Sequence, residues 1–215
     1  MAIKKRPVSP RQKMINLMYV VLMAMLALNV STEVLNGFSI VEESLKRTTA
    51  NATKENQALY DDFAEQMQKN PQKVKQWFDK SQQVKQMSDQ LYNLAEELKL
   101  AIVHEADGKD GDISNIRNKE DLEAATQVML APSRGRGKEL YDAINNYREQ
   151  LLKLVIDEHQ KKMIASNLTT EIPKDAVTLG KNWQEYMFES MPAAAAVTLL
   201  SKLRSEEHTS ELQSR

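Results

Sequence analysis

The longest apolar run of the chain lies close to its N-terminus. Residues 14–30, MINLMYVVLMAMLALNV, are seventeen positions without a charged side chain. As a helix the run is about 26 Å long, close to the hydrocarbon thickness of a bilayer. Basic residues cluster before it and acidic residues follow it: Lys4, Lys5, Arg6, Arg11 and Lys13, then Glu33, Glu42 and Glu43. This asymmetry predicts a membrane helix with the N-terminus in the cytoplasm and the bulk of the chain on the other side.

Capping signals extend this helix beyond the apolar run. Ser9 is suited to the N-cap, Pro10 to the first helical position and Gln12 to reach back toward the cap. We therefore expect a transmembrane helix at 9–36, after a basic cytoplasmic tail at 1–8. A cleaved signal peptide is the alternative. It is disfavoured because no clean small-x-small site followed by a turn lies near residues 24–31, and Val34 and Leu35 continue the helical spacing.

The remaining chain shows helical periodicity and no alternation typical of strands. Helices are expected up to about Met67 and over 72–106, 119–130, 138–165, 183–188 and 193–203, with a loop at 166–182. The helix at 72–106 carries a heptad seam, and the helix at 138–165 has one apolar face: Val84, Met87, Leu91, Leu94, Leu98 and Ala101, then Leu140, Ile144, Tyr147, Leu151 and Leu154. The prediction is all-α, with an antiparallel helical bundle domain at 37–203.

The last twelve residues differ from what precedes them. RSEEHTSELQSR, 204–215, abandons the apolar spacing of Val197, Leu200 and Leu203, and it matches the translation of a common sequencing-library adapter. A natural polar tail is the alternative. We expect 204–215 to be a non-native, adapter-derived tail.

Composition narrows the function. The chain has 215 residues, a net charge of -1 and no cysteine, so it offers no argument for nucleic-acid binding and no thiol chemistry. His104 and His159 lie on different predicted helices, and the acidic loop at 107–115 has Asn115 where a calcium loop needs its turn glycine. No nucleophile–base pair can be proposed from spacing. We therefore expect no enzyme activity, no metal and no cofactor.

The membrane helix carries two faces suited to helix packing. One has a heptad period: Arg11, Ile15, Met18, Leu22, Met25 and Asn29, with Asn29 able to fix the register between two copies. The other is made of small residues: Ala24, Ala27 and Ser31. Plain contact with lipid is the alternative for both faces. Arg11 lies in the first turn, where the helix dipole disfavours a cation. It can extend to lipid phosphates or pair with a carboxylate of a neighbouring membrane helix, and the residues alone leave both open.

Three segments resemble one known family. SPRQKMINLMYVVLMAMLALNVSTEVLNGF (9–38), DGKDGDISNIRNKEDLEAA (107–125) and KNWQEYMFESMPAAAAVTLLSKL (181–203) are similar to the N-terminal part of the GldM/PorM family of type IX secretion and gliding motility. The resemblance implies a homodimeric, single-pass inner-membrane protein whose membrane helices lie inside a multi-subunit GldL/PorL-like ring. Such a motor uses ion-motive force and acts on periplasmic and outer-membrane secretion components. The family's membrane-proximal arginine matches Arg11, which favours pairing with a carboxylate of the ring.

A sensor is the alternative function. Chemoreceptor-like proteins also combine an anchor of this orientation with a helical periplasmic bundle that binds a ligand. They would need a second membrane span and a cytoplasmic signalling module, which the 215 residues do not show.

Overall fold

The computed structural model describes residues 9–28 and 31–213, and within these ranges all regular structure is helical. The predicted all-α fold is therefore confirmed. The helices are α1 (Pro10–Leu28), α2 (Thr32–Lys69), α3 (Pro71–Asp107), α4 (Ala124–Leu130), α5 (Gly137–Leu154), α6 (Glu158–Asn167), α7 (Lys174–Thr178), α8 (Trp183–Phe188) and α9 (Ala193–Gln213).

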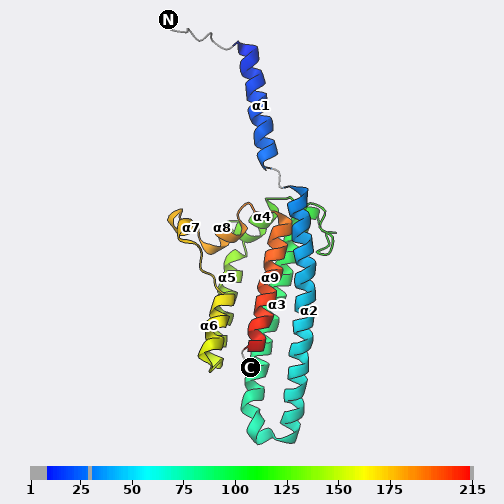
Figure 1. The fold of residues 1–215 in the computed structure, drawn as a ribbon, viewed down its shortest axis with the longest axis vertical. Helices are drawn as coiled ribbons and strands as arrows, with labels where there is room; N and C mark the ends of the chain where they lie inside the picture. Colours follow the sequence, from blue (N-terminus) through cyan, green and yellow to red (C-terminus); the bar gives the residue numbers. More distant parts are fainter. Residues whose placement is uncertain (1–8, 29–30, 214–215) are drawn as a thin grey trace.

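Three long helices form the axis of the molecule (Figure 1). α2 and α3 make an antiparallel hairpin, and α9 packs against both of them. The 38 residues of α2 make a rod of about 57 Å. α4 and α5 pack against another side of α3 near the end of the bundle from which α1 projects, and α8 packs against α4 and α5. α1 stands apart from the bundle in this view.

The hydrophobic core lies around α3 and is built from α3, α4, α5, α6, α8 and α9. The short helix α8 contributes aromatic residues: the ring of Trp183 lies 5.7 Å from that of Tyr141 and 6.1 Å from that of Phe188. A capping box of Asn182 and Glu185 starts α8, which fixes where these rings enter the core. The fully buried large side chains of the core include Leu98, Ile102, Met129, Leu140, Ile144, Leu151, Ile164, Leu168, Phe188 and Leu200.

The predicted seam of α3 is correct in one row and incomplete in the other. Val84, Leu91 and Leu98 are buried, whereas Met87, Leu94 and Ala101 are only partly buried. A further buried row, also spaced by seven, consists of Ser81, Ser88, Ala95 and Ile102. Apolar periodicity did not reveal this row because two of its members are serines.

Caps set several helix boundaries where the sequence prediction was wrong. The expected helix at 138–165 is two helices, because the chain extends at Val155 and the carboxylate of Asp157 accepts the Gln160 N–H at 2.8 Å to start α6. α4 begins at Ala124 rather than at 119, since Asp121 Oδ1 accepts the N–H groups of Glu123 and Ala124 at 2.8 and 3.0 Å. The predicted loop at 166–182 contains α7, and α9 continues past Leu203.

Candidate functional site

The start of α1 follows its capping signal. The Gln12 N–H donates to Ser9 Oγ at 3.3 Å, the Lys13 N–H donates to the Ser9 carbonyl at 3.0 Å, and Pro10 is the first helical residue. The side chain of Gln12 does not reach back as predicted; it donates forward to Asn16 Oδ1 at 3.2 Å. Arg11 therefore lies in the first turn of α1, fully within the helix.

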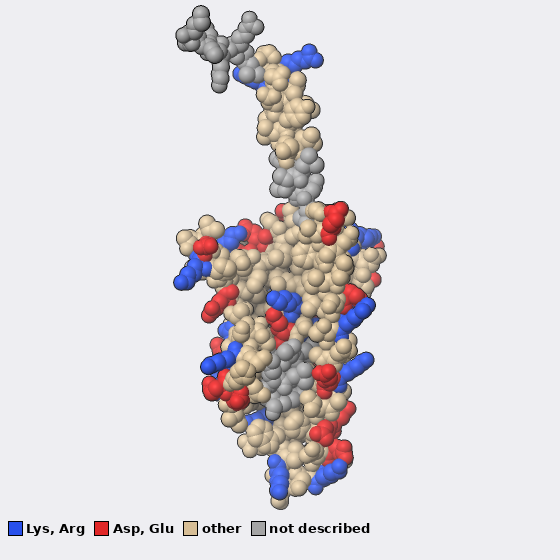
Figure 2. Space-filling view, in the orientation of Figure 1, with Lys and Arg blue, Asp and Glu red and all other residues tan. Residues whose placement is uncertain are grey.

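From Met14 to Met23 the surface of α1 is apolar apart from Asn16. Every side chain from Pro10 to Met23 is exposed, including Met18 at 69% and Val20 at 65%. Figure 2 shows uncharged residues along this helix and Lys and Arg side chains at its outer end. A helix that is apolar all round normally lies in apolar surroundings. Among the described residues, none covers it.

The residues predicted to pack on the two faces of this helix differ in where the structure places them. Arg11, Ile15, Met18 and Leu22 are all exposed on α1. Ala24, Met25 and Ala27 belong to the helical backbone of α1, but their side chains lie outside the described residues, as does all of Asn29. Ser31 is separate from α1: its backbone is extended, at φ -62° and ψ 139°, and it occupies the N-cap of α2 with its hydroxyl donating to Glu33.

No helix in the described ranges combines the length and the apolar character needed to cross a bilayer. The predicted membrane span at 9–36 is also not one helix, because α1 ends at Leu28 and α2 begins at Thr32 after the extended Ser31.

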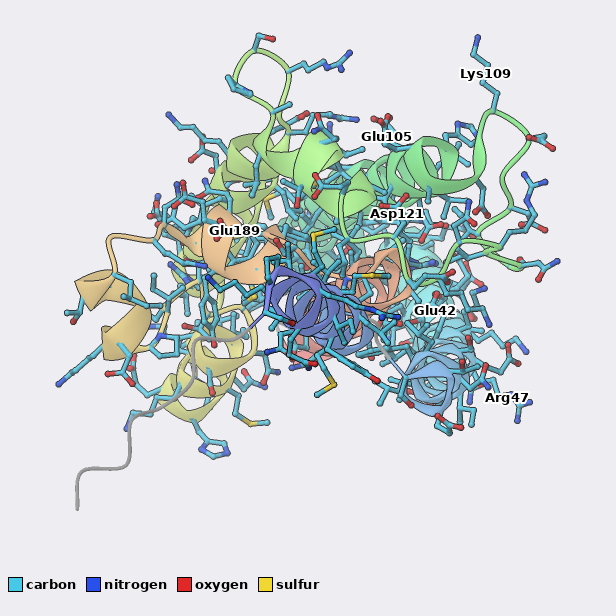
Figure 3. The ribbon with its side chains drawn as sticks, turned by 90° about the horizontal axis from the view of Figure 1, so that it is seen from above. Glu42, Arg47, Glu105, Lys109, Asp121 and Glu189 are labelled. Carbon is cyan, nitrogen blue, oxygen red and sulfur yellow. The ribbon has the colours of Figure 1, made fainter. Side chains whose placement is uncertain are left out.

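A buried charged cluster joins α2, α3 and α9. The ammonium of Lys99 on α3 lies 2.9 Å from Glu96 Oε1 and 3.8 Å from Glu42 Oε1 on α2, and only 2% of the Lys99 side chain is exposed. Ser201 of α9 donates to the same Glu42 oxygen at 2.7 Å. Figure 3, along the bundle, shows Glu42 on the inner side of α2 and Arg47 pointing away from the bundle. One carboxylate thus connects all three long helices.

Further polar contacts hold the same region of α2. The Thr198 hydroxyl of α9 donates to the Phe38 carbonyl at 3.3 Å, and the Lys119 ammonium donates to Ser39 Oγ at 2.9 Å. On the other side of Glu96, Arg204 donates to Oε1 at 3.1 Å and its guanidinium lies 3.8 Å from the centre of the Tyr92 ring. Hydrogen bonds and charges therefore join the N-terminal half of α2 to the bundle.

A second charged group links α3 to the start of α5. Arg136 Nε donates to Glu139 Oε2 at 2.7 Å, and its Nη2 donates to Glu97 Oε2 at 3.1 Å. The hydrogen bonds from Arg136 lower the pKa of Glu139 below its ordinary value. This exposed group stabilises a connection between helices.

The acidic loop after α3 uses its carboxylates within the fold. Asp107 accepts the backbone N–H groups of Arg117 and Asn118 at 2.7 and 2.8 Å, and Asp121 accepts the Ala124 N–H at the start of α4 at 3.0 Å. In the part of the chain that the structure describes, no three His, Asp or Glu side chains are grouped to hold a metal. These hydrogen bonds therefore fix the connection between α3 and α4.

Sequence reasoning missed Glu42, Lys99 and Ser201 because it ranked positions by hydrophobicity. A weak signal was present: Glu42 and Thr49 continue at seven-residue intervals from Leu35, where an inward-facing row of α2 would be expected. Lys99 had no such signal, since its burial depends on how α3 packs against other helices, including Glu42 of α2.

The family model described as the GldM N-terminal domain matches residues 33–213, from the first turn of α2 to the end of α9. The chain belongs to the GldM family. The family resemblance is thus confirmed, and it places the protein in the gliding and type IX secretion machinery. The matched range includes residues 204–213, which the sequence pattern predicts to be a non-native tail. No curated protein matches the chain.

Proposed function

We propose that this GldM-family protein is the membrane-anchored element of an ion-motive-force-driven motor. In this proposal it transmits energy from an inner-membrane partner ring to periplasmic and outer-membrane secretion components. The observation that carries the proposal is α1: an exposed, apolar helix with basic residues at its start lies directly before the matched GldM domain. Such a helix is suited to lipid or to the apolar helices of a membrane partner.

The proposed arrangement is a homodimer whose two α1 helices lie inside a GldL/PorL-like ring. The N-terminus is cytoplasmic, and the domain formed by α2 to α9 lies in the periplasm. Residues 14–32 contain no ionisable side chain other than Tyr19, so the group that carries the ion belongs to the ring. The role of the protein is then mechanical, without enzymatic chemistry or a cofactor.

Arg11 is the proposed point of engagement with the ring. It lies in the first turn of α1 and is exposed, and the described residues offer its guanidinium no carboxylate. In the assembly a carboxylate of the ring would pair with this guanidinium. Breaking a buried ion pair on one side typically costs about 3–5 kcal/mol, because the remaining charge is stranded.

The test is a graded series at Arg11 in the full-length protein. Arg11→Ala and Arg11→Glu should abolish secretion and gliding, whereas Arg11→Lys should retain part of both, because lysine keeps the charge and loses the planar fork. Lys13→Ala is the matched control, since it removes a neighbouring charge on a different side of α1 and should leave secretion unchanged. Membrane insertion is followed by fractionation and should persist throughout. Normal secretion by an inserted, assembled Arg11→Ala protein would mean that Arg11 only contacts lipid.

A further inference from the structure

The side of α2 that packs against the bundle is unusually polar. Its buried residues are Leu35, Glu42, Thr49, Asn56 and Tyr60, and the first four are spaced by seven, so they form one row along the helix. Facing elements also supply buried polar residues: Ser81, Ser88 and Lys99 from α3, and Thr198 and Ser201 from α9. Among the described residues, the main apolar cluster contains none from α2. α2 is therefore attached by a polar interface to a body that has its own hydrophobic core.

This difference in chemistry has a mechanical consequence. Apolar packing is non-directional, so it favours contact without strongly fixing how far one helix has slid along another. Buried polar partners fix one register, because any other register leaves them unpaired. The axial position of α2 is thus set by its polar contacts.

Glu42 and Lys99 are the centre of that interface. Glu42 Oε1 faces both the Lys99 ammonium at 3.8 Å and the Ser201 hydroxyl at 2.7 Å, whereas its other oxygen, Oε2, is buried with no donor among the described residues. Lys99 retains Glu96 as a closer partner, at 2.9 Å. An apolar replacement for such a buried pair is often as stable or more stable, so the charges serve specificity better than they serve stability.

We propose that Glu42, Lys99 and Ser201 form a register clamp through which α2 transmits force to the α3–α9 pair. The inference rests on the proposed function, because α2 is the element that follows α1 and would receive its motion first. In the clamp, Lys99 and Ser201 hold the same carboxylate from two different helices. Movement of α2 along its axis is thereby passed to α3 and α9 together, and the apolar core passes it on to the rest of the domain.

Glu42→Gln in the full-length protein separates transmission from folding. The amide oxygen can still accept from Ser201, and Lys99 keeps Glu96, so the domain should remain folded. We expect its resistance to added protease in native membranes to equal that of the wild type. Secretion should fall at least about fivefold, the lower range of measured coupling effects. Glu43→Gln, on the exposed neighbour, is the control and should change neither measurement.

The pair Lys99→Met and Lys99→Met/Glu42→Gln provides the second comparison. The single variant leaves Glu42 ionised and stranded, so protease resistance and secretion should both fall. The double variant removes both charges while Glu96, about one third exposed, stays accessible to water. It should recover protease resistance and still secrete poorly. Lys54→Met, on the exposed side of α2, is the control for losing a lysine.

Normal secretion by a folded Glu42→Gln protein, or recovery of both properties in the double variant, overturns the clamp. If the double variant remains protease-sensitive, the secretion measured for the folded Glu42→Gln protein alone decides whether the clamp exists. Arg11→Ala, measured in parallel, tests the proposed function independently. If Arg11→Ala secretes normally and Glu42→Gln does not, the coupling at the ring is contradicted and the clamp is retained. If Glu42→Gln secretes normally and Arg11→Ala does not, only the clamp is contradicted.

Discussion

At the scale of single residues, two glycines occupy opposite environments. A Cβ at Gly137, the first residue of α5, would lie 2.7 Å from the Met129 carbonyl oxygen and 3.0 Å from the side chain of Gln184. The end of α4, the start of α5 and the start of α8 thus approach too closely for any side chain there. Gly37, inside α2, has nothing within 4 Å of the position of its missing Cβ.

Alanine at these two glycines should therefore act in opposite directions. Gly137→Ala forces backbone to move and should lower the free energy of unfolding by about 1–3 kcal/mol, as overpacking typically does. Gly37→Ala should raise it by about 0.5–1 kcal/mol, because alanine is favoured over glycine within a helix. Denaturant unfolding of the purified proteins measures both. Equal stability of the two variants would show that α4 and α5 shift apart without cost.

At the scale of elements, hydrophobic spacing located the helices better than it located their ends. The rows through Leu91 and Leu140 were predictable because burial against a core repeats every three to four residues. The break before α6 was not, since it depends on the local hydrogen bond from Gln160 to Asp157, and the sequence pattern of apolar residues continues across it. Buried Lys99 was unpredictable for another reason: its burial comes from helices distant in the sequence.

The end of α9 gives a prediction for the tail. Arg204 contacts Tyr92 and Glu96, whereas burial raises the pKa of Glu206, which means that the fold disfavours its ionised form. Because the apolar spacing of α9 ends at Leu203 and the fold disfavours the ionised Glu206, deleting 205–215 should change the free energy of unfolding by less than about 0.5 kcal/mol. Deleting Arg204 as well should cost about 1–2 kcal/mol more, because only 22% of its side chain is exposed and a cation–π contact is stronger where it is desolvated. A loss of several kcal/mol on the shorter deletion would show that 205–215 is a packed, genuine part of the domain.

At the scale of the whole molecule, the two candidate sites differ in how far the sequence predicted them. The exposed apolar surface of α1 could be predicted because hydropathy and charge asymmetry are properties of a contiguous segment. The polar interface of α2 could not, because Glu42, Lys99 and Ser201 come from three helices and meet only in the folded bundle. α2 follows the apolar α1 in the chain and packs along α3 and α9 of a body with its own core (Figure 1).

The proposed function requires one orientation in the membrane. Lys4, Lys5, Arg6, Arg11 and Lys13 precede the apolar run, and flanking basic residues keep their side of a membrane helix in the cytoplasm. A reporter active only in the periplasm should therefore be active when fused after Leu203, and a reporter active only in the cytoplasm should be silent there. Fusions placed before Ser9 should give the opposite pair of results and serve as the control. If the cytoplasmic reporter is active after Leu203, the bundle is on the wrong side of the membrane to receive motion from the ring, and the motor proposal fails.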